Sequence, residues 1–279
     1  MPELPEVETV RQTLRKTILN AKITKVSVIY DKIIKGNPDD FIMKTSGKTI
    51  CEIDRVGKYL IFVLDDIAFV SHLRMEGKYN ILGVGAEIGK HEHIIFHLAD
   101  GRELRYHDTR KFGRMELKSR DNYKNEPPLS KLGPEPFTAD ADLLYKRLKK
   151  SRLPIKSLLL DQTILNGIGN IYANEICYQL RINPHVPGNQ ITEEKTKELI
   201  AVASRILIEA IALGGTTIHS FTTGGVSGRF QTKLKVHGKK ECPACLKPVI
   251  KAQIGGRGTY YCESCQSAES EEINHAKKQ

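Results

Sequence analysis

The first residues of this 279-residue chain carry the groups best suited to covalent chemistry. Met1 precedes a small residue, so we expect its removal, which leaves Pro2 with a free secondary amine. A deprotonated amine attacks aldehyde-like carbons and forms a Schiff base. Glu3 is adjacent to this amine, and Glu6 follows one helical turn after Glu3. Two interpretations stay open at this point: a nucleophile accompanied by carboxyl groups, or the acidic, capped start of a surface helix.

Cysteine spacing is the strongest local signal in the chain. The four residues concerned are Cys242, Cys245, Cys262 and Cys265. They form two Cys-x-x-Cys pairs separated by sixteen residues, which is typical of a tetrahedral zinc site. Four thiolates leave no open coordination position, so we expect a structural zinc ion. Strand-like residues 249–254 and 259–262 predict a zinc-held hairpin with Arg257 at its tip, or alternatively a zinc ribbon that binds protein.

The secondary structure expected to position these groups changes along the chain from a helix to strands. Residues 4–18 place apolar side chains at spacings of three and four, which predicts an amphipathic helix. Short apolar or alternating runs follow, separated by turn residues, and they predict a sandwich or barrel of strands. The expected strands span residues 23–30, 59–64, 68–73, 93–98, 103–107 and 114–117.

The second half is predicted to be helical. Residues 122–136 contain four prolines and few apolar side chains, so we place a linker between domains there. Helices are expected over residues 139–150, 155–160, 171–180 and 192–213, the last capped by Thr192. The break at residues 166–170 either places bare backbone amides and Asn170 near a phosphate or is a plain turn between helices. Residues 218–231 have the composition of a loop, either a lid or a connection.

Charge and hydropathy narrow the class of protein. The formal net charge is +10 and the isoelectric point is about 9.2, which favours a polyanionic partner such as nucleic acid. No run of eighteen apolar residues is present, so no transmembrane helix is expected. The acidic start lacks the apolar region of a signal peptide, which indicates an intracellular protein.

Three polar turns in the first half could contact nucleic acid. Lys58 lies in a basic turn, Met75 lies among basic groups at a strand end, and residues 107–114 combine three cations with Phe112. Cations neutralise phosphates, and an apolar wedge fills the space left by an unstacked base. The structural alternatives are a solvated lysine, a core methionine and a charged hairpin tip. Residues 91–93 read His-Glu-His, but no third ligand follows at a metalloenzyme spacing, so we interpret them as the entry to a strand.

Together these motifs resemble the bacterial formamidopyrimidine-DNA glycosylase family. The resemblance rests on residues 2–10, 71–78, 107–114 and 160–175 and on the terminal cysteine pairs, in family order. It implies an α+β fold, with an N-terminal β-sandwich flanked by helices and a C-terminal helix-two-turn-helix domain with a zinc-bound hairpin finger. The implied parts are a catalytic domain (1–121), a linker (122–137), the helical domain (138–236), the finger (237–266) and a tail (267–279) that we expect to be disordered.

The resemblance also implies an activity. The substrate would be duplex DNA carrying 8-oxoguanine or a formamidopyrimidine, excised through a Schiff base on Pro2 and followed by β- and δ-elimination. The catalytic residues would be Pro2, Glu3, Lys58 and Arg257, with Glu6 in support. The DNA-binding residues would be His72, Met75, His91, Arg110, Phe112, Lys156 and Asn170. Met75, Arg110 and Phe112 would fill the gap left by the everted nucleotide, and residues 216–230 would cap its base.

The expected partner is double-stranded DNA with oxidised purines or abasic sites. We expect one zinc ion, no nucleotide cofactor, no membrane contact and a monomer in the bacterial cytoplasm, used at the nucleoid. His237 departs from the tyrosine that the family often has, and the tail extends beyond the usual end. The alternatives are an endonuclease VIII-like enzyme for oxidised pyrimidines, which the continuation after Leu4 disfavours, and a non-catalytic DNA-binding or zinc-ribbon protein.

Overall fold

The computed structural model describes residues 1–216 and 228–266. The chain divides into two compact units that are not contiguous in sequence. The first unit consists of residues 1–131 and 210–231, and the second of residues 132–209 and 232–279. The predicted segments 217–227 and 267–279, which include most of the expected capping loop and the whole expected tail, lie outside the described residues.

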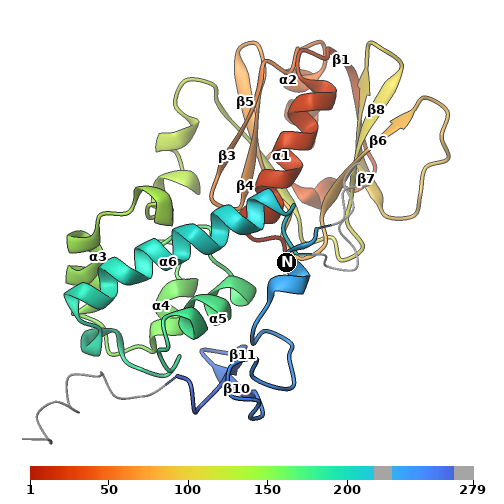
Figure 1. The fold of residues 1–279 in the computed structure, drawn as a ribbon. Helices are drawn as coiled ribbons and strands as arrows, with labels where there is room; N and C mark the ends of the chain where they lie inside the picture. Colours follow the sequence, from red (N-terminus) through yellow and green to blue (C-terminus); the bar gives the residue numbers. More distant parts are fainter. Residues whose placement is uncertain (217–227, 267–279) are drawn as a thin grey trace, which may run out of the picture. The chain divides into compact units, whose positions relative to one another are not determined.

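Two antiparallel-rich sheets form the first unit (Figure 1). The five-stranded sheet has the order β2 (Ile34–Lys35), β9 (Arg114–Ser119), β5 (Ile67–His72), β4 (Tyr59–Val63) and β3 (Glu52–Val56). The four-stranded sheet has the order β1 (Ile23–Val28), β7 (Glu92–Leu98), β8 (Arg102–His107) and β6 (Lys78–Gly83). All six expected strands are confirmed, whereas β2, β3 and β6 were not expected.

Aromatic stacking between the sheets confirms the predicted sandwich. Phe69 of β5 stacks on Phe62 of β4, with ring centroids 4.5 Å apart and planes 8° apart. Phe69 also stacks on Phe96 of β7, in the other sheet, at 5.4 Å and 6°. All three rings are fully buried, so one hydrophobic core fills the space between the sheets.

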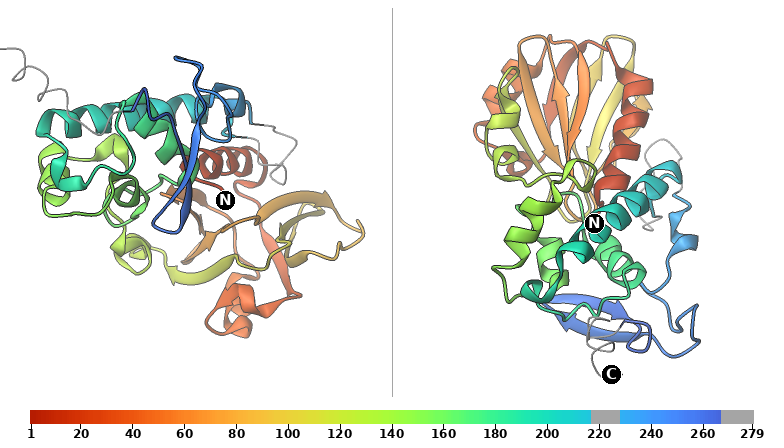
Figure 2. Two further views of the ribbon diagram at one scale, coloured as in Figure 1. Left: turned by 90° about the horizontal axis from the view of Figure 1, so that it is seen from below. Right: turned by 60° about the vertical axis from the view of Figure 1, so that its left-hand side comes forward.

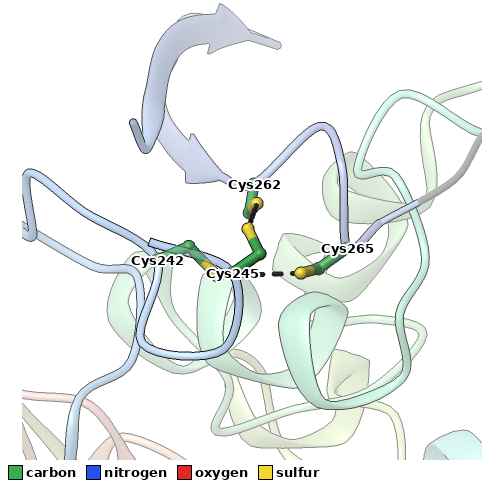
Figure 3. A group of neighbouring side chains, drawn as sticks. All are labelled: Cys242, Cys245, Cys262 and Cys265. Atoms are coloured by element: carbon green, nitrogen blue, oxygen red, sulfur yellow. Dashed lines mark hydrogen bonds between the residues drawn. The ribbon is translucent and has the colours of Figure 1, made fainter. Parts of the chain in front are cut away.

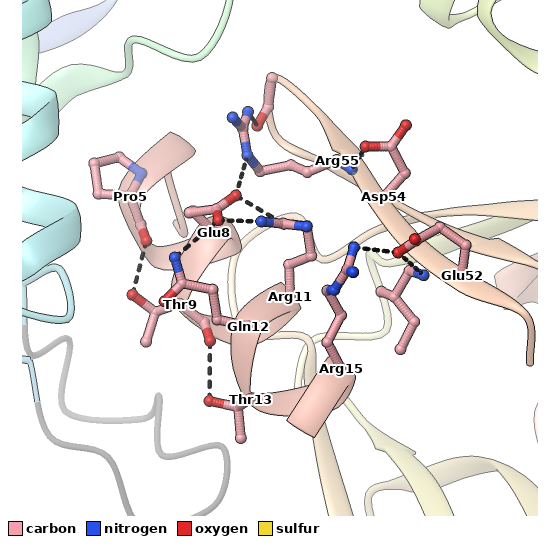
Figure 4. Close-up of polar contacts among 12 residues, drawn as sticks. Pro5, Glu8, Thr9, Arg11, Gln12, Thr13, Arg15, Glu52, Asp54 and Arg55 are labelled. Atoms are coloured by element: carbon pink, nitrogen blue, oxygen red, sulfur yellow. Dashed lines mark hydrogen bonds and ion pairs between the residues drawn. The ribbon is translucent and has the colours of Figure 1, made fainter. Parts of the chain in front are cut away.

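Helix α1 (Leu4–Ile18) packs on β3 and β4 through the predicted apolar stripe, which is buried along its whole length. A polar clamp reinforces the packing: Glu8 accepts hydrogen bonds from Arg11 on the same helix and from Arg55 at 2.9 Å on β3 (Figure 4). A second helix, α2 (Pro38–Thr45), contacts β1 and was not expected. Because Arg11 and Arg55 both bind Glu8, this carboxylate stabilises the fold and is not a candidate catalytic group.

The second unit carries the expected helices, α3 (Ala141–Leu148), α4 (Ile155–Leu160) and α5 (Asn170–Gln179), and most of α6 (Glu193–Ala212), whose last residues belong to the first unit. Thr192 caps α6 as predicted, because its hydroxyl accepts a hydrogen bond from the Lys195 amide at 3.1 Å. The hairpin β10 (Ile250–Ile254) and β11 (Arg257–Tyr261) is visible in blue in Figure 2. No helix in the described part of the chain is long and apolar enough to span a membrane.

Short 3₁₀ turns complete the structure: η1 (Asp31–Ile33), η2 (Tyr123–Asn125), η3 (Leu129–Lys131), η4 (Pro136–Thr138), η5 (Gly188–Gln190) and η6 (Phe230–Lys233). Two of them, η2 and η3, fall within the proline-rich segment 122–136, and η4 begins at its last residue. That segment is therefore folded locally, and the unit boundary falls inside it, between residues 131 and 132.

Candidate active site

The N-terminal residues form a closed network of backbone and carboxylate groups. Pro2 and Glu3 are buried, and Glu3 is the N-cap residue of α1 in a capping box with Glu6. One oxygen of Glu6 accepts the Glu3 amide at 2.9 Å, and the other accepts the amide and hydroxyl of Thr216 at 2.8 and 3.1 Å. Because Glu6 is held at three points, it fixes the end of α1 that carries Pro2.

The surroundings of the Met1 amine, one residue before Pro2, disfavour a positive charge. Burial lowers the pKa of the Met1 amine, nearby Lys58 lowers it as well, and Glu3 and Glu6 act in the opposite direction. A lowered pKa increases the fraction of neutral amine, which is the form that attacks carbon. Lys58 lies in the β3–β4 turn after Gly57, whose φ is +56°, and only 5 % of Lys58 is exposed. The solvated-lysine alternative is therefore wrong.

A first turn presents Met75 between β5 and β6. Met75 is half-buried and is not the core residue of the structural alternative. The turn is closed by a hydrogen bond from the Gly77 amide to the Leu73 carbonyl at 2.9 Å. A Cβ atom on Gly77 would lie 2.2 Å from the hydroxyl oxygen of Tyr106, so only glycine permits this approach.

A second turn, residues 107–114, presents Arg110 and Phe112. Asp108 organises it from inside, accepting the Arg110 amide at 3.0 Å and the Gly113 amide at 2.8 Å. The Arg110 guanidinium lies 4.7 Å from the centre of the Phe112 ring, which is 47 % exposed. This cation and this exposed ring are the pair expected of a wedge that enters a base stack.

The two turns share the same support. A Cβ atom on Gly113 would lie 1.7 Å from the same Tyr106 hydroxyl that approaches Gly77. The Thr109 hydroxyl also donates a hydrogen bond to Glu76, directly joining the second turn to the first. Met75, Arg110 and Phe112 are therefore presented by one connected piece of the first unit.

The two predicted histidines differ in their surroundings. Burial, together with Arg74 and Lys58, lowers the pKa of His72 to about 3, so its imidazole is neutral at physiological pH. Its Nδ1 accepts the Arg74 amide at 2.9 Å, which leaves the proton on Nε2. His91 directly precedes β7 and is half-exposed. Within the described residues neither histidine belongs to a group that could hold a metal ion, and Glu92 begins the strand as predicted.

In the second unit, Asn170 is the first residue of α5, after the N-cap Gly169. The Gln162 side chain shapes the preceding loop by accepting the Gly167 amide at 3.0 Å and donating to the Ile168 carbonyl at 2.9 Å. Asn170 Oδ1 is buried and has no hydrogen-bond partner within the described residues. The backbone amides at the start of a helix favour an anion, whereas Asn170 Oδ1 itself is an acceptor that requires a donor.

The hairpin corrects two expectations. Its turn is Gly255-Gly256, with both φ values positive, and Arg257 is the first residue of β11, paired with Ile254. Arg257 is exposed beside the tip, not in it. Lys156 is fully buried, and its ammonium donates to the Gly258 carbonyl at 2.9 Å and to the Thr259 hydroxyl at 2.7 Å. Lys156 therefore supports the hairpin and has no exposed surface for the expected DNA contact.

Four thiols converge next to the hairpin (Figure 3). The sulfur atoms of Cys242, Cys245, Cys262 and Cys265 all lie within 4.8 Å of one another. The Cys245–Cys262 and Cys242–Cys265 sulfur distances are 3.4 and 3.7 Å. Zinc–sulfur bonds of about 2.3 Å give a tetrahedral edge of roughly 3.8 Å, so the donor set fits one metal ion with no open position.

Comparison with known proteins identifies the class. A family model for the formamidopyrimidine-DNA glycosylase N-terminal domain matches residues 1–115, and one for the H2TH domain of the same enzymes matches residues 132–222. The chain belongs to the formamidopyrimidine-DNA glycosylase family. It is 46 % identical to the Lactobacillus delbrueckii subsp. bulgaricus formamidopyrimidine-DNA glycosylase over 271 residues, covering 95 % of this chain and 99 % of that protein. The Bacillus licheniformis enzyme is 45 % identical over 273 residues, with the same coverage.

Solved structures agree with this assignment. The complex between Lactococcus lactis Fpg and an abasic site containing DNA is similar with a TM-score of 0.91 and 40 % identity, covering 95 % of this chain and 99 % of that one. The complex of wild-type Lactococcus lactis Fpg with N7-benzyl-Fapy-dG containing DNA has a TM-score of 0.90 at the same identity and coverage. The expected fold and family are thus confirmed.

Several supporting residues were not anticipated. Asp108 and Tyr106 shape the turns, and Glu175 accepts three consecutive amides, from Lys235 at 2.7 Å, from residue 236 at 3.0 Å and from His237 at 2.8 Å. Asp108 and Glu175 lie inside recognised motifs, but the sequence does not show which amides they accept.

Proposed function

We propose that this protein is a bifunctional base-excision repair enzyme that removes oxidised purines from duplex DNA and then cleaves the abasic strand. The observation that carries the proposal is the buried Pro2 at the start of α1, next to Glu3, whose amide is fixed by Glu6 at 2.9 Å. Membership of the formamidopyrimidine-DNA glycosylase family supports the substrate class. The Lactococcus lactis relatives in complex with Fapy-dG and abasic-site DNA support duplex DNA as the partner.

The first step forms the covalent intermediate. After removal of Met1, the neutral nitrogen of Pro2 attacks C1′ of the everted nucleotide, the C1′–N9 bond breaks, and the base leaves with the bonding electrons and a proton. Opening of the sugar ring gives an iminium between Pro2 and C1′. Glu3 is adjacent to this nitrogen and serves as the acid/base group that protonates the ring oxygen.

Elimination then cleaves the strand. Loss of a C2′ proton expels the 3′ phosphate, and a second elimination expels the 5′ phosphate, so the sugar is released after hydrolysis of the iminium. Lys58 is buried, and its positive charge acts on the terminal amine. We assign Lys58 and Arg257 to the phosphates and proton transfers of these steps, because Lys58 places a cation in the β3–β4 turn and Arg257 places one beside the Gly255-Gly256 turn.

The proposed DNA contacts fall into two kinds. Met75, Arg110 and Phe112 fill the gap left by the everted nucleotide, with Arg110 bonded to the unpaired cytosine. His72, His91 and Asn170 contact the backbone, which sets register without reading sequence. Lys156 acts on DNA indirectly, through the hairpin that carries Arg257.

The metal and the setting complete the proposal. Cys242, Cys245, Cys262 and Cys265 would hold one zinc ion, which supplies folding free energy to a hairpin with almost no core of its own. The reaction described above uses no nucleotide cofactor. We propose a monomer that acts in the bacterial cytoplasm, where zinc thiolates stay reduced.

Borohydride trapping tests the proposal directly. The untagged protein is incubated with a duplex holding one 8-oxoguanine opposite cytosine, reduced, and mapped by mass spectrometry. The expected result is an adduct on Pro2 and a doubly eliminated product without reductant. The matched control retains extra residues before Pro2, which should abolish the adduct and leave DNA binding largely intact.

Other outcomes would overturn specific parts. An adduct formed only with an oxidised-pyrimidine duplex would assign the enzyme to the endonuclease VIII-like alternative. Binding with no adduct on any lesion or abasic site would mean that the protein is not an enzyme of this kind. Normal cleavage by the blocked control would exclude Pro2 as the nucleophile.

A further inference from the structure

A buried charge cluster lies beneath the loop that precedes His91. Arg105 of β8 is 1 % exposed and lies between two largely buried carboxylates, Glu92 and Glu103. Its Nη1 contacts Glu92 at 2.7 Å, and its Nε contacts Glu103 at 2.7 Å. Burying charged groups costs free energy unless they are fully paired, so a buried cluster of three charges needs an explanation. Neither the sequence motifs nor the proposed reaction provides one.

The remaining donors of Arg105 hold the loop itself. Nη1 donates to the Glu87 carbonyl at 2.9 Å, and Nη2 donates to the Ala86 carbonyl at 2.6 Å. The guanidinium therefore donates four hydrogen bonds, and its Nη2 also lies 2.6 Å from Glu103 in an ion pair. The loop around residues 84–90 is exposed, and its amides are also bound outside the loop, from Val84 to the Gly101 carbonyl and from Gly89 to the Glu92 carboxylate.

Glu92, the residue after His91, links Arg105 to the loop through hydrogen bonds. The carboxylate oxygen that binds Arg105 also accepts the Gly89 amide at 3.0 Å, and the Glu92 amide donates to the Gly89 carbonyl at 3.0 Å. His91 therefore lies between two segments that are hydrogen-bonded to Arg105: the loop before it and Glu92 after it. Its carbonyl accepts the Asp108 amide at 2.9 Å, which joins it to the turn that presents Arg110.

His91 also has an unmet polar group. Its Nδ1 is buried and has no hydrogen-bond partner among the described residues, and its ring lies edge-on to His107 at 5.7 Å. Nδ1 of His107 is likewise buried without a partner among these residues. His91 as a whole is half-exposed, so part of the residue remains accessible to a ligand.

We infer that Arg105, together with Glu92, is a positioning residue that fixes His91 for contact with the DNA backbone. This inference rests on the proposed function, because it assumes that DNA is the ligand of His91. The proposed function gives this charge cluster no DNA contact of its own. The inference predicts that the cluster changes DNA affinity through His91 alone.

A double-mutant cycle tests the inference. Affinity is measured for a duplex with a tetrahydrofuran abasic analogue, using Arg105→Lys, His91→Ala and the double variant. Lysine retains the charge but offers three donors where arginine offers five, so Arg105→Lys should weaken binding about 5- to 10-fold, and His91→Ala about 10-fold. The double variant should bind no more weakly than His91→Ala.

Two further variants keep the test decisive. Arg102→Lys, on the same strand but partly exposed and paired with Asp100, is the matched control and should not change affinity. Glu92→Gln keeps an acceptor for the Gly89 amide and repeats the cycle if Arg105→Lys does not fold. The single-turnover trapping rate at saturating DNA should stay unchanged while the half-saturating concentration rises, which general unfolding would not produce.

The outcomes separate this inference from the proposed function. Additive losses, or wild-type affinity in Arg105→Lys, would overturn the positioning role. Unchanged affinity in His91→Ala would also overturn it, while Pro2 trapping would continue. Failure of wild-type trapping would remove the proposed reaction, yet the affinity cycle on abasic DNA would still report whether Arg105 acts through His91.

Discussion

Replacing Gly113 by alanine should displace the wedge turn while leaving the rest of the sandwich intact. Gly113 lies between Phe112 and the start of β9, and its amide is bound by Asp108. An alanine Cβ there would meet the Tyr106 hydroxyl at 1.7 Å and the Tyr106 Cζ at 2.7 Å. Tyr106 is fully buried against Tyr79, with ring centroids 5.3 Å apart, so the ring has little room to retreat.

The magnitude follows from the overlap. Ordinary contact begins near 3.4 Å, so the hydroxyl and the methyl must separate by about a further 1.7 Å. Overpacking of a buried site costs about 1–3 kcal/mol. At roughly 2–4 °C per kcal/mol for a unit of this size, the Tm should fall by about 2–12 °C. The turn has an alternative to unfolding, which is to move Phe112 outward and lose the Asp108 bond.

The assay pairs thermal unfolding with affinity for abasic-analogue DNA. The matched control is Gly83→Ala at the end of β6, where a Cβ would meet nothing within 4 Å. This control should melt at or slightly above the wild-type temperature, because alanine lowers backbone entropy in the unfolded state. Gly113→Ala should bind about tenfold more weakly, or worse, since Arg110 and Phe112 lose their support.

A rescue variant makes the reasoning refutable. Tyr106→Phe removes the atom that is approached at 1.7 Å and should restore part of the Tm and affinity lost in Gly113→Ala. If Gly113→Ala melts and binds like Gly83→Ala, then the Tyr106 contact does not position the turn. If Tyr106→Phe restores nothing, then the loss arises from the backbone and not from the hydroxyl.

Three further predictions concern the metal, one carboxylate and one helix cap. Cys242→Ser, or zinc chelation, should abolish metal content and weaken abasic-DNA binding more than tenfold while the first unit melts unchanged, as followed by elemental analysis and calorimetry. Burial would raise the pKa of Glu8, but hydrogen bonds from Arg11 and Arg55 prevail and lower it to about 2. A lowered folded-state pKa stabilises above the unfolded value near 4.5, so the stability advantage over Glu8→Gln, on the order of 1–2 kcal/mol, should shrink as pH falls from 5 to 2; a constant difference would contradict this. Thr192→Ala should cost about 1 kcal/mol by removing the cap of α6, and an unchanged melting curve would show that the cap is dispensable.

Sequence patterns correctly predicted those parts of the structure that depend on interactions between residues close in sequence. The cysteine pairs, the apolar stripe of α1 and the cap of α6 each depend on residues close in sequence. The strands β4 and β5 were found because they are almost continuously apolar. Strand β3 reads Glu-Ile-Asp-Arg-Val and buries fully only Ile53, so its pairing with β4 decided its structure. Helix α2 did carry a local signal, the cap Asn37 before Pro38, which could have revealed it.

Long polar side chains were the hardest to place from sequence. Lys58 and Lys156 both lie in basic or amphipathic segments, and each is buried in the structure. Burial of a lysine depends on acceptors supplied by distant segments, as Gly258 and Thr259 do for Lys156 across more than a hundred residues. Spacing alone holds no information on such partners, so surface contacts and internal supports look alike in the sequence.

The carboxylate of Glu6 links the beginning of the chain to Thr216, a separation of 210 residues. During translation at about 5–20 residues per second, Glu6 is made roughly 10–40 s before Thr216. Residues 1–131 can build both sheets in that interval, but the segment 210–231 that completes their unit arrives late. A nascent chain therefore contains Pro2 before it contains Thr216, the residue that fixes Glu6. A product terminated before Thr216 should form both sheets yet fail to form the covalent adduct with DNA.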